Sequence, residues 1–249
     1  MTVALRLIAP VVGGGSHSPL LQHYDLSGID LSEVAVKKGP YEIETEIQDA
    51  LAVPYVLQAA LEAQREGVDA VIIDCMTDPG LNQLREALSI PVIGVAETAM
   101  HLAAQLSHRF AWIDPSPHSR VFVETQVIRY GLGGKLASFR AVNISPSQLA
   151  SNPKATEEAL IEQALAAVND DGAGMIILGC TDFLGFKDKL ESALKEQGNN
   201  IQVIDPTIAA IYQAAGLVKM NIGQSKYDYP TPGAIKSLGY EDIPFPDNE

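Results

Sequence analysis

The fold is decided by two stretches of the chain, IILGCTDF (residues 176–183) and VIIDCMTD (residues 71–78). Each begins with a short apolar run, which is typical of a buried strand, and continues into a cysteine with small polar residues after it. These are the only two cysteines among the 249 residues. Their matching places indicate that the two stretches belong to two copies of one structural unit.

The similarity extends outward from both stretches. Residues 57–95 and 161–206 each contain a helical pattern, a glycine, a short apolar strand, the cysteine with a nearby Thr-Asp, a second helical pattern and a strand that opens I-x-V-I. This repeated order predicts an internal duplication. Throughout the chain, apolar strands alternate with helices of ten or more residues, which predicts an α/β fold with parallel sheets.

The predicted architecture is therefore two similar parallel-sheet α/β domains related by a pseudo-two-fold axis, with the active site in the cleft between them. We expect residues 1–97 and a returning helix at 207–218 to form the first domain. Residues 98–206 would form the second. Residues 219–249 are rich in proline and acidic residues and are expected to be a C-terminal arm or tail.

Composition excludes several classes of protein. The formal net charge of −14 argues against nucleic acid and anionic membranes as partners, because both select basic surfaces. The N-terminal residues lack the pattern of a secretory leader, and no apolar run is long enough to span a membrane. Two cysteines are too few for a disulfide framework, so we expect free thiols and a cytoplasmic protein. The partner that we expect is a small-molecule substrate.

Both cysteines follow strands, and ligands of open parallel sheets bind beyond the carboxyl ends of the strands. A helix start after each cysteine would lower the thiol pKa and offer N–H groups to an anion. If the cysteines meet across one cleft, one thiolate can remove a proton from one face of a stereocentre while the other thiol protonates the opposite face. That chemistry is racemisation. The alternatives are two inert core cysteines or a disulfide.

Other polar residues are candidates for substrate contact. The loop GGGSHS follows the first strand and matches neither a dinucleotide nor a phosphate-binding motif, so Gly14, Gly15, Ser16 and His17 are candidate substrate contacts; the alternative is a flexible turn. His118 follows a strand and is equally consistent with a structural role. No Cys/His cluster has the spacing of metal ligands, so we expect no metal.

Five segments, in this order, resemble the hydantoin racemases of the aspartate/glutamate/hydantoin racemase superfamily: GPYEIETEIQDALAVP, DCMTDPGL, PVIGVAETAMHLAAQLSHRF, YGLGGKLASFRA and LGC. The resemblance covers roughly residues 3–218 and implies two α/β domains, no cofactor and a homo-oligomer. It also implies that Cys75 and Cys180 are the catalytic acid and base. Thr77 and Thr181 match positions that help to hold the substrate, and Asp78 matches a turn typical of hydantoin racemases.

The substrate expected from this resemblance is a hydantoin-type cyclic ureide, with a free amino acid as the alternative. The second cysteine is followed by Thr-Asp-Phe rather than Ala-Gly-Met, which is closer to amino-acid racemases. Asp182 would then meet a cationic group of the substrate, although it can equally cap a helix. Two other functions stay open: a cysteine-dependent decarboxylase or cis–trans isomerase of the same superfamily, and a non-catalytic small-molecule binding protein.

Overall fold

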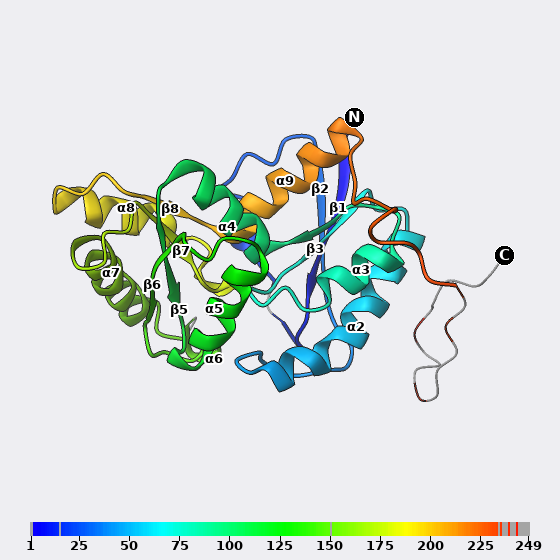
Figure 1. Cartoon of the computed structure of the whole chain (residues 1–249), viewed down its shortest axis with the longest axis horizontal. Coiled ribbons are helices and arrows are strands. Elements are labelled where there is room, and N and C mark those ends of the chain that lie inside the picture. Colours follow the sequence, from blue (N-terminus) through cyan, green and yellow to red (C-terminus); the bar gives the residue numbers. More distant parts are fainter. Residues whose placement is uncertain are drawn as a thin grey trace. The chain divides into compact units, whose positions relative to one another are not determined.

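The computed structural model describes residues 2–14, 16–149, 151–233, 235, 239 and 243. The chain divides into two compact units (Figure 1). Unit 1 contains residues up to Ile43, Ile47–Val95 and the segment from Ala210 onward, and unit 2 contains Glu44–Glu46 and Ala96–Ala209. The chain therefore leaves unit 1 after Val95 and returns at Ala210, two and three residues from the boundaries expected from the sequence.

Unit 1 is built on a four-stranded parallel sheet. Its strands are β1 (Val3–Ala9), β2 (Ile29–Ala35), β3 (Ala70–Ile73) and β4 (Val92–Gly94), in the order β2-β1-β3-β4. The central strand β3 is buried along its whole length, as its continuous apolar sequence requires. The carboxyl ends of β1 and β3 therefore lie side by side, which brings the loop after β1 next to the residues that follow Ile73.

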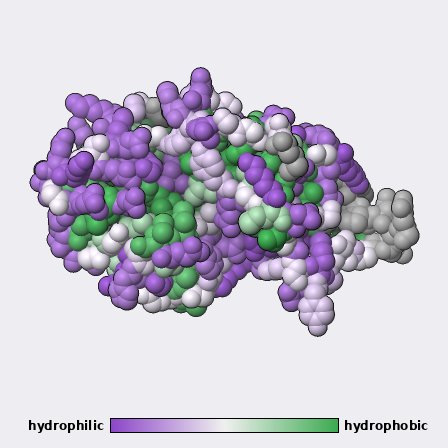
Figure 2. Space-filling model, turned by 90° about the horizontal axis from the view of Figure 1, so that it is seen from above, coloured by the Kyte–Doolittle hydropathy of each residue, from purple (hydrophilic) through white to green (hydrophobic). Residues whose placement is uncertain are grey.

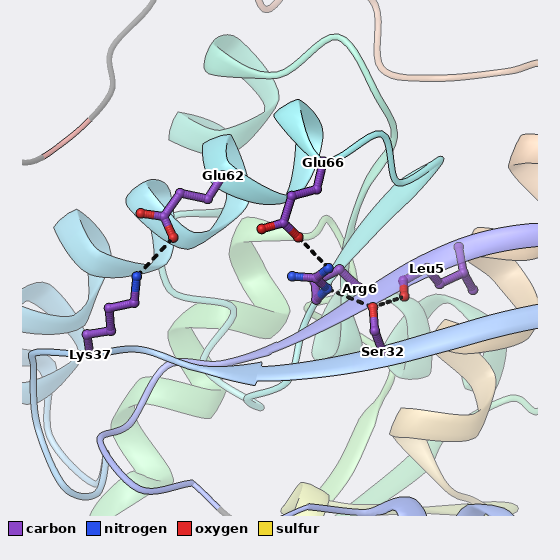
Figure 3. A network of polar contacts seen from close by, with 6 residues as sticks. All are labelled: Leu5, Arg6, Ser32, Lys37, Glu62 and Glu66. Atoms are coloured by element: carbon purple, nitrogen blue, oxygen red, sulfur yellow. Dashed lines mark hydrogen bonds and ion pairs between the residues drawn. The ribbon is translucent and has the colours of Figure 1, made fainter.

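The helices of unit 1 are α1 (Ser18–Leu21), α2 (Glu46–Arg65), α3 (Leu81–Ala87) and α9 (Pro206–Met220). A polar network fastens the end of α2 to the sheet: Arg6 donates to Ser32 over 2.7 Å and to Glu66 over 2.7 Å, and the Ser32 hydroxyl donates to the carbonyl of Leu5 (Figure 3). At the other end of the chain, α9 returns to unit 1, where Tyr212 donates to the carbonyl of Asp25.

Unit 2 repeats the same topology. Its strands are β5 (Phe110–Asp114), β6 (Leu136–Ala141), β7 (Met175–Leu178) and β8 (Gln202–Ile204), in the order β6-β5-β7-β8. Two parallel four-stranded sheets of equivalent strand order confirm the predicted α/β class and the two similar domains. In this match β1 corresponds to β5, and β3 corresponds to β7.

Helices also connect the strands of unit 2, and one of them shows how local sequence sets its start. The side chain of Asn152 accepts a hydrogen bond from the N–H of Ala155 over 3.3 Å, and Pro153 occupies the first helical position. The elements are α4 (Val95–Leu106), the 3₁₀ turn η1 (Pro117–Ser119), α5 (Arg120–Arg129), α6 (Pro146–Leu149), α7 (Pro153–Asn169), the 3₁₀ turn η2 (Thr181–Phe183) and α8 (Lys187–Glu196).

The beginning of the predicted C-terminal arm packs on unit 1. The side-chain amide of Gln224 donates to the carbonyls of Leu88 and Ile90. The ammonium group of Lys226 donates to the carbonyls of Arg85 and Glu86, at the end of α3. The contacts of Lys226 satisfy carbonyl groups that a helix end leaves without partners within the helix. The arm thus caps the C-terminal end of α3.

The surface in Figure 2 carries several separate apolar patches among hydrophilic residues. Large apolar side chains that are exposed include Leu106 at the end of α4, Val121 and Ile128 on α5, and Met220 at the end of α9. Among the described residues, no helix has both the length and the hydropathy needed to cross a membrane.

Candidate active site

The first cysteine lies in a tight turn at the carboxyl end of β3. The N–H of Asp74 still donates to Ile8 of β1 over 2.9 Å, so the strand ends immediately before Cys75. The carbonyl of Cys75 then accepts the N–H of Asp78 over 3.0 Å. Asp78 has φ +50°, and Gly80 has φ +76° before α3 begins at Leu81. The Asp-Pro-Gly sequence therefore forms a turn between the cysteine and the helix.

Burial dominates the environment of the Cys75 thiol. Desolvation raises the pKa of Cys75 to about 12; the nearby charges of Asp49 and Asp78 add to the effect, and the hydrogen bond with Thr77 opposes it. The Thr77 hydroxyl lies 3.2 Å from the Cys75 sulfur. The expectation of a lowered thiol pKa is therefore wrong for Cys75, because the turn places the start of α3 six residues after the sulfur and burial outweighs the helix terminus.

Asp78 is buried against the end of the neighbouring strand. The residue is 3% exposed. A Cβ added to Gly94, the last residue of β4, would lie 2.6 Å from the carboxyl carbon of Asp78 and 2.7 Å from each of its oxygens. Position 94 must therefore be a glycine for the carboxylate to lie where it does, and Asp78 packs within unit 1.

The second cysteine occupies the equivalent place in unit 2. The N–H of Gly179 donates to Ile113 of β5 over 2.7 Å, which matches the bond from Asp74 to Ile8. Cys180 follows, and its carbonyl accepts the N–H of Phe183 over 3.1 Å in the turn η2. Thr181 is half-buried, whereas Asp182 is exposed, with a carboxylate oxygen 4.0 Å from the Cys180 sulfur. A single 3₁₀ turn thus replaces the predicted helix start, and α8 begins only at Lys187.

The loop after β1 lies beside the cysteine turn of unit 1. His17 is 7% exposed, and its Nε2 lies 2.8 Å from Oδ2 of the equally buried Asp74. Ser16 is exposed and donates to Glu33 of β2. Gly14 and these four residues contribute to the lining of a cavity of about 330 Å³ at the carboxyl ends of β1 and β2. Gly15, another predicted contact, lies outside the described residues.

In unit 2, the side chain of Asp114 holds the start of the loop after β5. This carboxylate is 5% exposed and accepts hydrogen bonds from Nε1 of Trp112 over 2.9 Å and from the N–H of Ser116 over 3.0 Å. Burial raises the pKa of Asp114 to about 6, against the opposing effect of these hydrogen bonds. His118 is exposed in η1, and its N–H donates to the Ser116 hydroxyl.

Within unit 1 the structure brings Gly14, Ser16 and His17 to the strand ends beside the turn that carries Cys75, Thr77 and Asp78. Within unit 2 it places Cys180, Thr181 and Asp182 in one turn after β7, while His118 follows the neighbouring strand β5. Among the described residues, no group of three or more His, Cys, Asp or Glu side chains could hold a metal ion.

Sequence reasoning missed three buried or partly buried carboxylates at these strand ends: Asp74, Asp114 and Glu33. The signal available for two of them was an acidic residue directly after an apolar strand, in IIDC and in WIDP. Burying a charged residue at that place is costly unless a hydrogen-bond partner replaces the lost water. Each of these residues is therefore a candidate for a specific hydrogen-bond partner.

A family model described as Asp/Glu/Hydantoin racemase matches residues 23–214. A hydantoin racemase from Pseudomonas sp. (strain NS671) is 33% identical over 220 residues, which are 86% of this chain and 86% of that protein. An allantoin racemase from Klebsiella pneumoniae has a TM-score of 0.89 at 26% identity, covering 98% of this chain and 100% of that one. The allantoin racemase from Pseudomonas fluorescens, at 23% identity, shares the fold with a TM-score of 0.85 and covers 95% of this chain and 100% of that one.

Two duplicated α/β units with a cysteine at the same strand end in each, together with these relatives, define the protein as a racemase, which is an isomerase. The family match covers most of the chain, and so does the 33% identity to the hydantoin racemase, so together they identify one family. The chain belongs to the Asp/Glu/hydantoin racemase family.

Proposed function

We propose that the protein racemises a five-membered cyclic ureide of the hydantoin or allantoin kind, and that Cys75 and Cys180 exchange protons with opposite faces of its stereocentre. The observation that carries this proposal is the equivalence of the two cysteines. Each follows a central strand by the same number of residues after an equivalent ladder hydrogen bond, from Asp74 to Ile8 and from Gly179 to Ile113.

The proposed reaction needs no group beyond two thiols and hydrogen-bond donors. One cysteine thiolate takes the proton from the ring carbon next to the carbonyl, and the electron pair left behind delocalises onto the carbonyl oxygen as an enolate. N–H groups aimed at that oxygen would stabilise the developing charge. The other cysteine then donates its proton to the opposite face of the carbon. The stereocentre is inverted, and the two sulfurs have exchanged protonation states.

The protonation of Cys75 suggests its role in one direction of the reaction. Because burial raises its pKa to about 12, Cys75 is a thiol at neutral pH in the free protein. A thiol is the form that donates a proton, so Cys75 would be the acid in the direction that begins from this state. In the opposite direction Cys75 becomes the base, and bound substrate must favour its thiolate.

Two observations favour a ureide over a free amino acid. A free amino acid presents an ammonium group and calls for a carboxylate at the site. Of the two aspartates that the sequence offers for this role, Asp78 is packed against Gly94, and Asp182 is solvent-exposed. In addition, relatives that match most of the chain are described as hydantoin and allantoin racemases, which suggests a neutral ring held by hydrogen bonds.

The test is a panel of enantiopure 5-substituted hydantoins, allantoin, free amino acids and a substituted malonate, incubated with the protein in deuterated buffer. Loss of optical rotation and deuterium uptake at the stereocentre are followed together. We expect both with at least one ureide and neither with the amino acids. Racemisation of an amino acid, or release of CO₂ from the malonate without ureide exchange, would contradict the proposal.

A further inference from the structure

A buried carboxylate lies next to the cysteine turn in each unit, but the two carboxylates are on different strands. In unit 1, Ile8 of β1 pairs with Ile73 of β3, so the next pair along the strands is Ala9 and Asp74. Asp74 is therefore on the cysteine strand, one residue before Cys75.

In unit 2, Ile113 of β5 pairs with Leu178 of β7, so the next pair is Asp114 and Gly179. Here the carboxylate is on the first strand, and a glycine precedes Cys180. Asp74 and Asp114 are 7% and 5% exposed. In both units the carboxylate thus belongs to the residue pair that comes directly before the cysteine. It is on the cysteine strand in unit 1 and on the neighbouring strand in unit 2.

Each carboxylate binds the N–H of an aromatic ring. The Nε2–H of His17 donates to Oδ2 of Asp74 over 2.8 Å, and the Nε1–H of Trp112 donates to Oδ2 of Asp114 over 2.9 Å. A hydrogen bond to an ionised carboxylate is stronger than one between neutral groups, and a buried one is protected from competing water. The duplicated units therefore use different residues for one interaction.

Packing explains why the carboxylate changed strands. A Cβ on Gly179 would lie 2.3 Å from Nε1 of Trp112, so the indole of unit 2 leaves no room for a side chain before Cys180. In unit 1, a Cβ on Gly14 would lie 2.8 Å from the Cβ of Ala9, so the loop packs directly on the residue that corresponds to Asp114. Unit 2 therefore has room for a carboxylate only on its first strand.

Both carboxylates hold the loop that follows the first strand of their unit. His17 belongs to the loop after β1, and its carbonyl accepts the N–H groups of Leu20 and Leu21 at the start of α1. Asp114 accepts the N–H of Ser116, in the loop after β5. In unit 1 the contact thus links the first loop directly to the residue before Cys75. In unit 2 Asp114 links the loop to its own strand, and the indole that Asp114 binds packs on Gly179, the residue before Cys180.

We propose that His17 with Asp74, and Trp112 with Asp114, are equivalent positioning pairs, each of which fixes the cysteine turn of its own unit. The inference rests on the proposed function of the two cysteines. His17 is then a positioning residue rather than a substrate contact. Acid-base catalysis depends on the direction in which each sulfur points, and a displacement of about 1 Å can lower a rate on the order of 100-fold.

The first experiment asks whether each pair serves its own cysteine. His17→Phe removes the N–H donor, and His17→Gln keeps an amide nitrogen near the place of Nε2. Trp112→Phe is the matched change in unit 2. Each is combined with Cys180→Ser, which leaves exchange at the face of Cys75, and with Cys75→Ser, which leaves exchange at the face of Cys180. Solvent deuterium uptake into each enantiomer of the ureide is measured, with circular dichroism to confirm folding.

We expect His17→Phe to slow the exchange that depends on Cys75 by about tenfold or more, and the exchange that depends on Cys180 by less than about twofold. His17→Gln should retain most of the rate. Trp112→Phe should show the reverse preference. Equal losses at both faces, or no loss at either, in variants with native circular dichroism would overturn the proposal.

The second experiment does not depend on any substrate. Alkylation of each cysteine by iodoacetamide is followed by mass spectrometry in the wild-type sequence and in the same variants. Loosening the turn of Cys75 admits water to a desolvated thiol, so His17→Phe should speed alkylation of Cys75 by about fivefold and leave that of Cys180 unchanged. Unchanged alkylation of Cys75 would overturn the pairing even if ureide exchange were never observed, and selective alkylation without ureide exchange would leave the pairing standing and reject the proposed substrate.

Discussion

The cysteine ends of the two units have the same backbone and different chemistry. Both have a central strand, one ladder hydrogen bond beyond its end, and a cysteine in the next position. Within this common backbone, the hydroxyl of Thr77 contacts the sulfur of Cys75, whereas a carboxylate oxygen of the exposed Asp182 lies 4.0 Å from the sulfur of Cys180. The comparison teaches that duplication preserved where the sulfurs are placed and left their surroundings free to diverge. A racemase needs such equivalence in position, because the two enantiomers of its substrate carry the exchanged proton on opposite faces of the stereocentre.

The largest test of this equivalence is to remove each sulfur in turn. Cys75→Ser and Cys180→Ser should each lower racemisation by about 1,000-fold, because a serine hydroxyl is a poor acid-base group near neutral pH. The measurement is loss of optical rotation with each pure enantiomer of a reactive ureide. If either single variant racemised at the wild-type rate, the two ends would not be functionally equivalent.

Exchange with solvent sharpens the same comparison. In Cys180→Ser, the enantiomer whose proton faces Cys75 should still take up deuterium without inversion. In Cys75→Ser, the opposite enantiomer should do so. Identical exchange patterns in the two variants would show that the cysteines do not act on opposite faces.

A second prediction tests the buried carboxylate of unit 2 through its pH dependence. Asp114 has a pKa raised by burial from 3.8 to about 6, so the unfolded chain releases this proton at lower pH than the folded protein. Stability contributed by protonated Asp114 is complete below pH 3.8 and is lost as the pH rises through about 6. The loss is about 3 kcal/mol at most. Urea unfolding of the wild type and of Asp114→Asn from pH 4 to 7 measures it, because only the wild type should lose this stability as the pH rises, and parallel curves would contradict it.

The third prediction concerns the place where the units carry different residues before the cysteine. Gly179→Ala should destabilise the protein by about 2 kcal/mol, because the new Cβ overlaps both the indole of Trp112 and the carbonyl oxygen of Ile113. Adding Trp112→Leu, which removes the indole, should make the glycine substitution less costly. Chemical denaturation of the single and double variants measures the coupling between the two sites. Additive losses would show that the indole does not determine the glycine.

The smallest expected effect is on the thiol itself. Thr77→Val removes the hydrogen bond that lowers the pKa of Cys75, so alkylation of Cys75 at pH 9 should slow by about fivefold, which corresponds to one hydrogen bond. Thr181→Val is the control in unit 2 and should leave Cys75 unchanged. Faster alkylation of Cys75 in Thr77→Val would mean that the threonine shields the sulfur more than it stabilises the thiolate.

The sequence predicted the features that depend on local pattern. The buried strands β3 and β7, the helix capped by Asn152 and the repeated order of elements are all legible in runs of neighbouring residues. Strand β2 was missed, because it lies at the sheet edge, is only half-buried, and carries Asp30, Ser32 and Glu33 among its apolar residues. Edge strands lack the continuous apolar signature of central ones.

Contacts between distant residues could not be predicted in the same way. Asp74 and His17 are 57 positions apart, and neither residue type identifies the other. The raised thiol pKa of Cys75 likewise depends on burial, which a turn of six residues does not reveal. The sequence therefore located the cysteines but not the groups that hold and tune them.

The return of the chain to unit 1 has a consequence for how the protein is made. Apart from Glu44–Glu46, unit 2 is one continuous segment, Ala96–Ala209, whereas unit 1 needs the residues from Ala210 onward. During synthesis from the N-terminus, the sheet of unit 1 is translated first yet must wait for Ala210, Ile211 and Ala214 of α9, whose side chains are buried, and for the arm that closes α3. Unit 1, whose sheet is made first, is therefore the later of the two units to finish folding. Its apolar strands stay exposed longest, and so have the most time to bind chaperones or to pair wrongly.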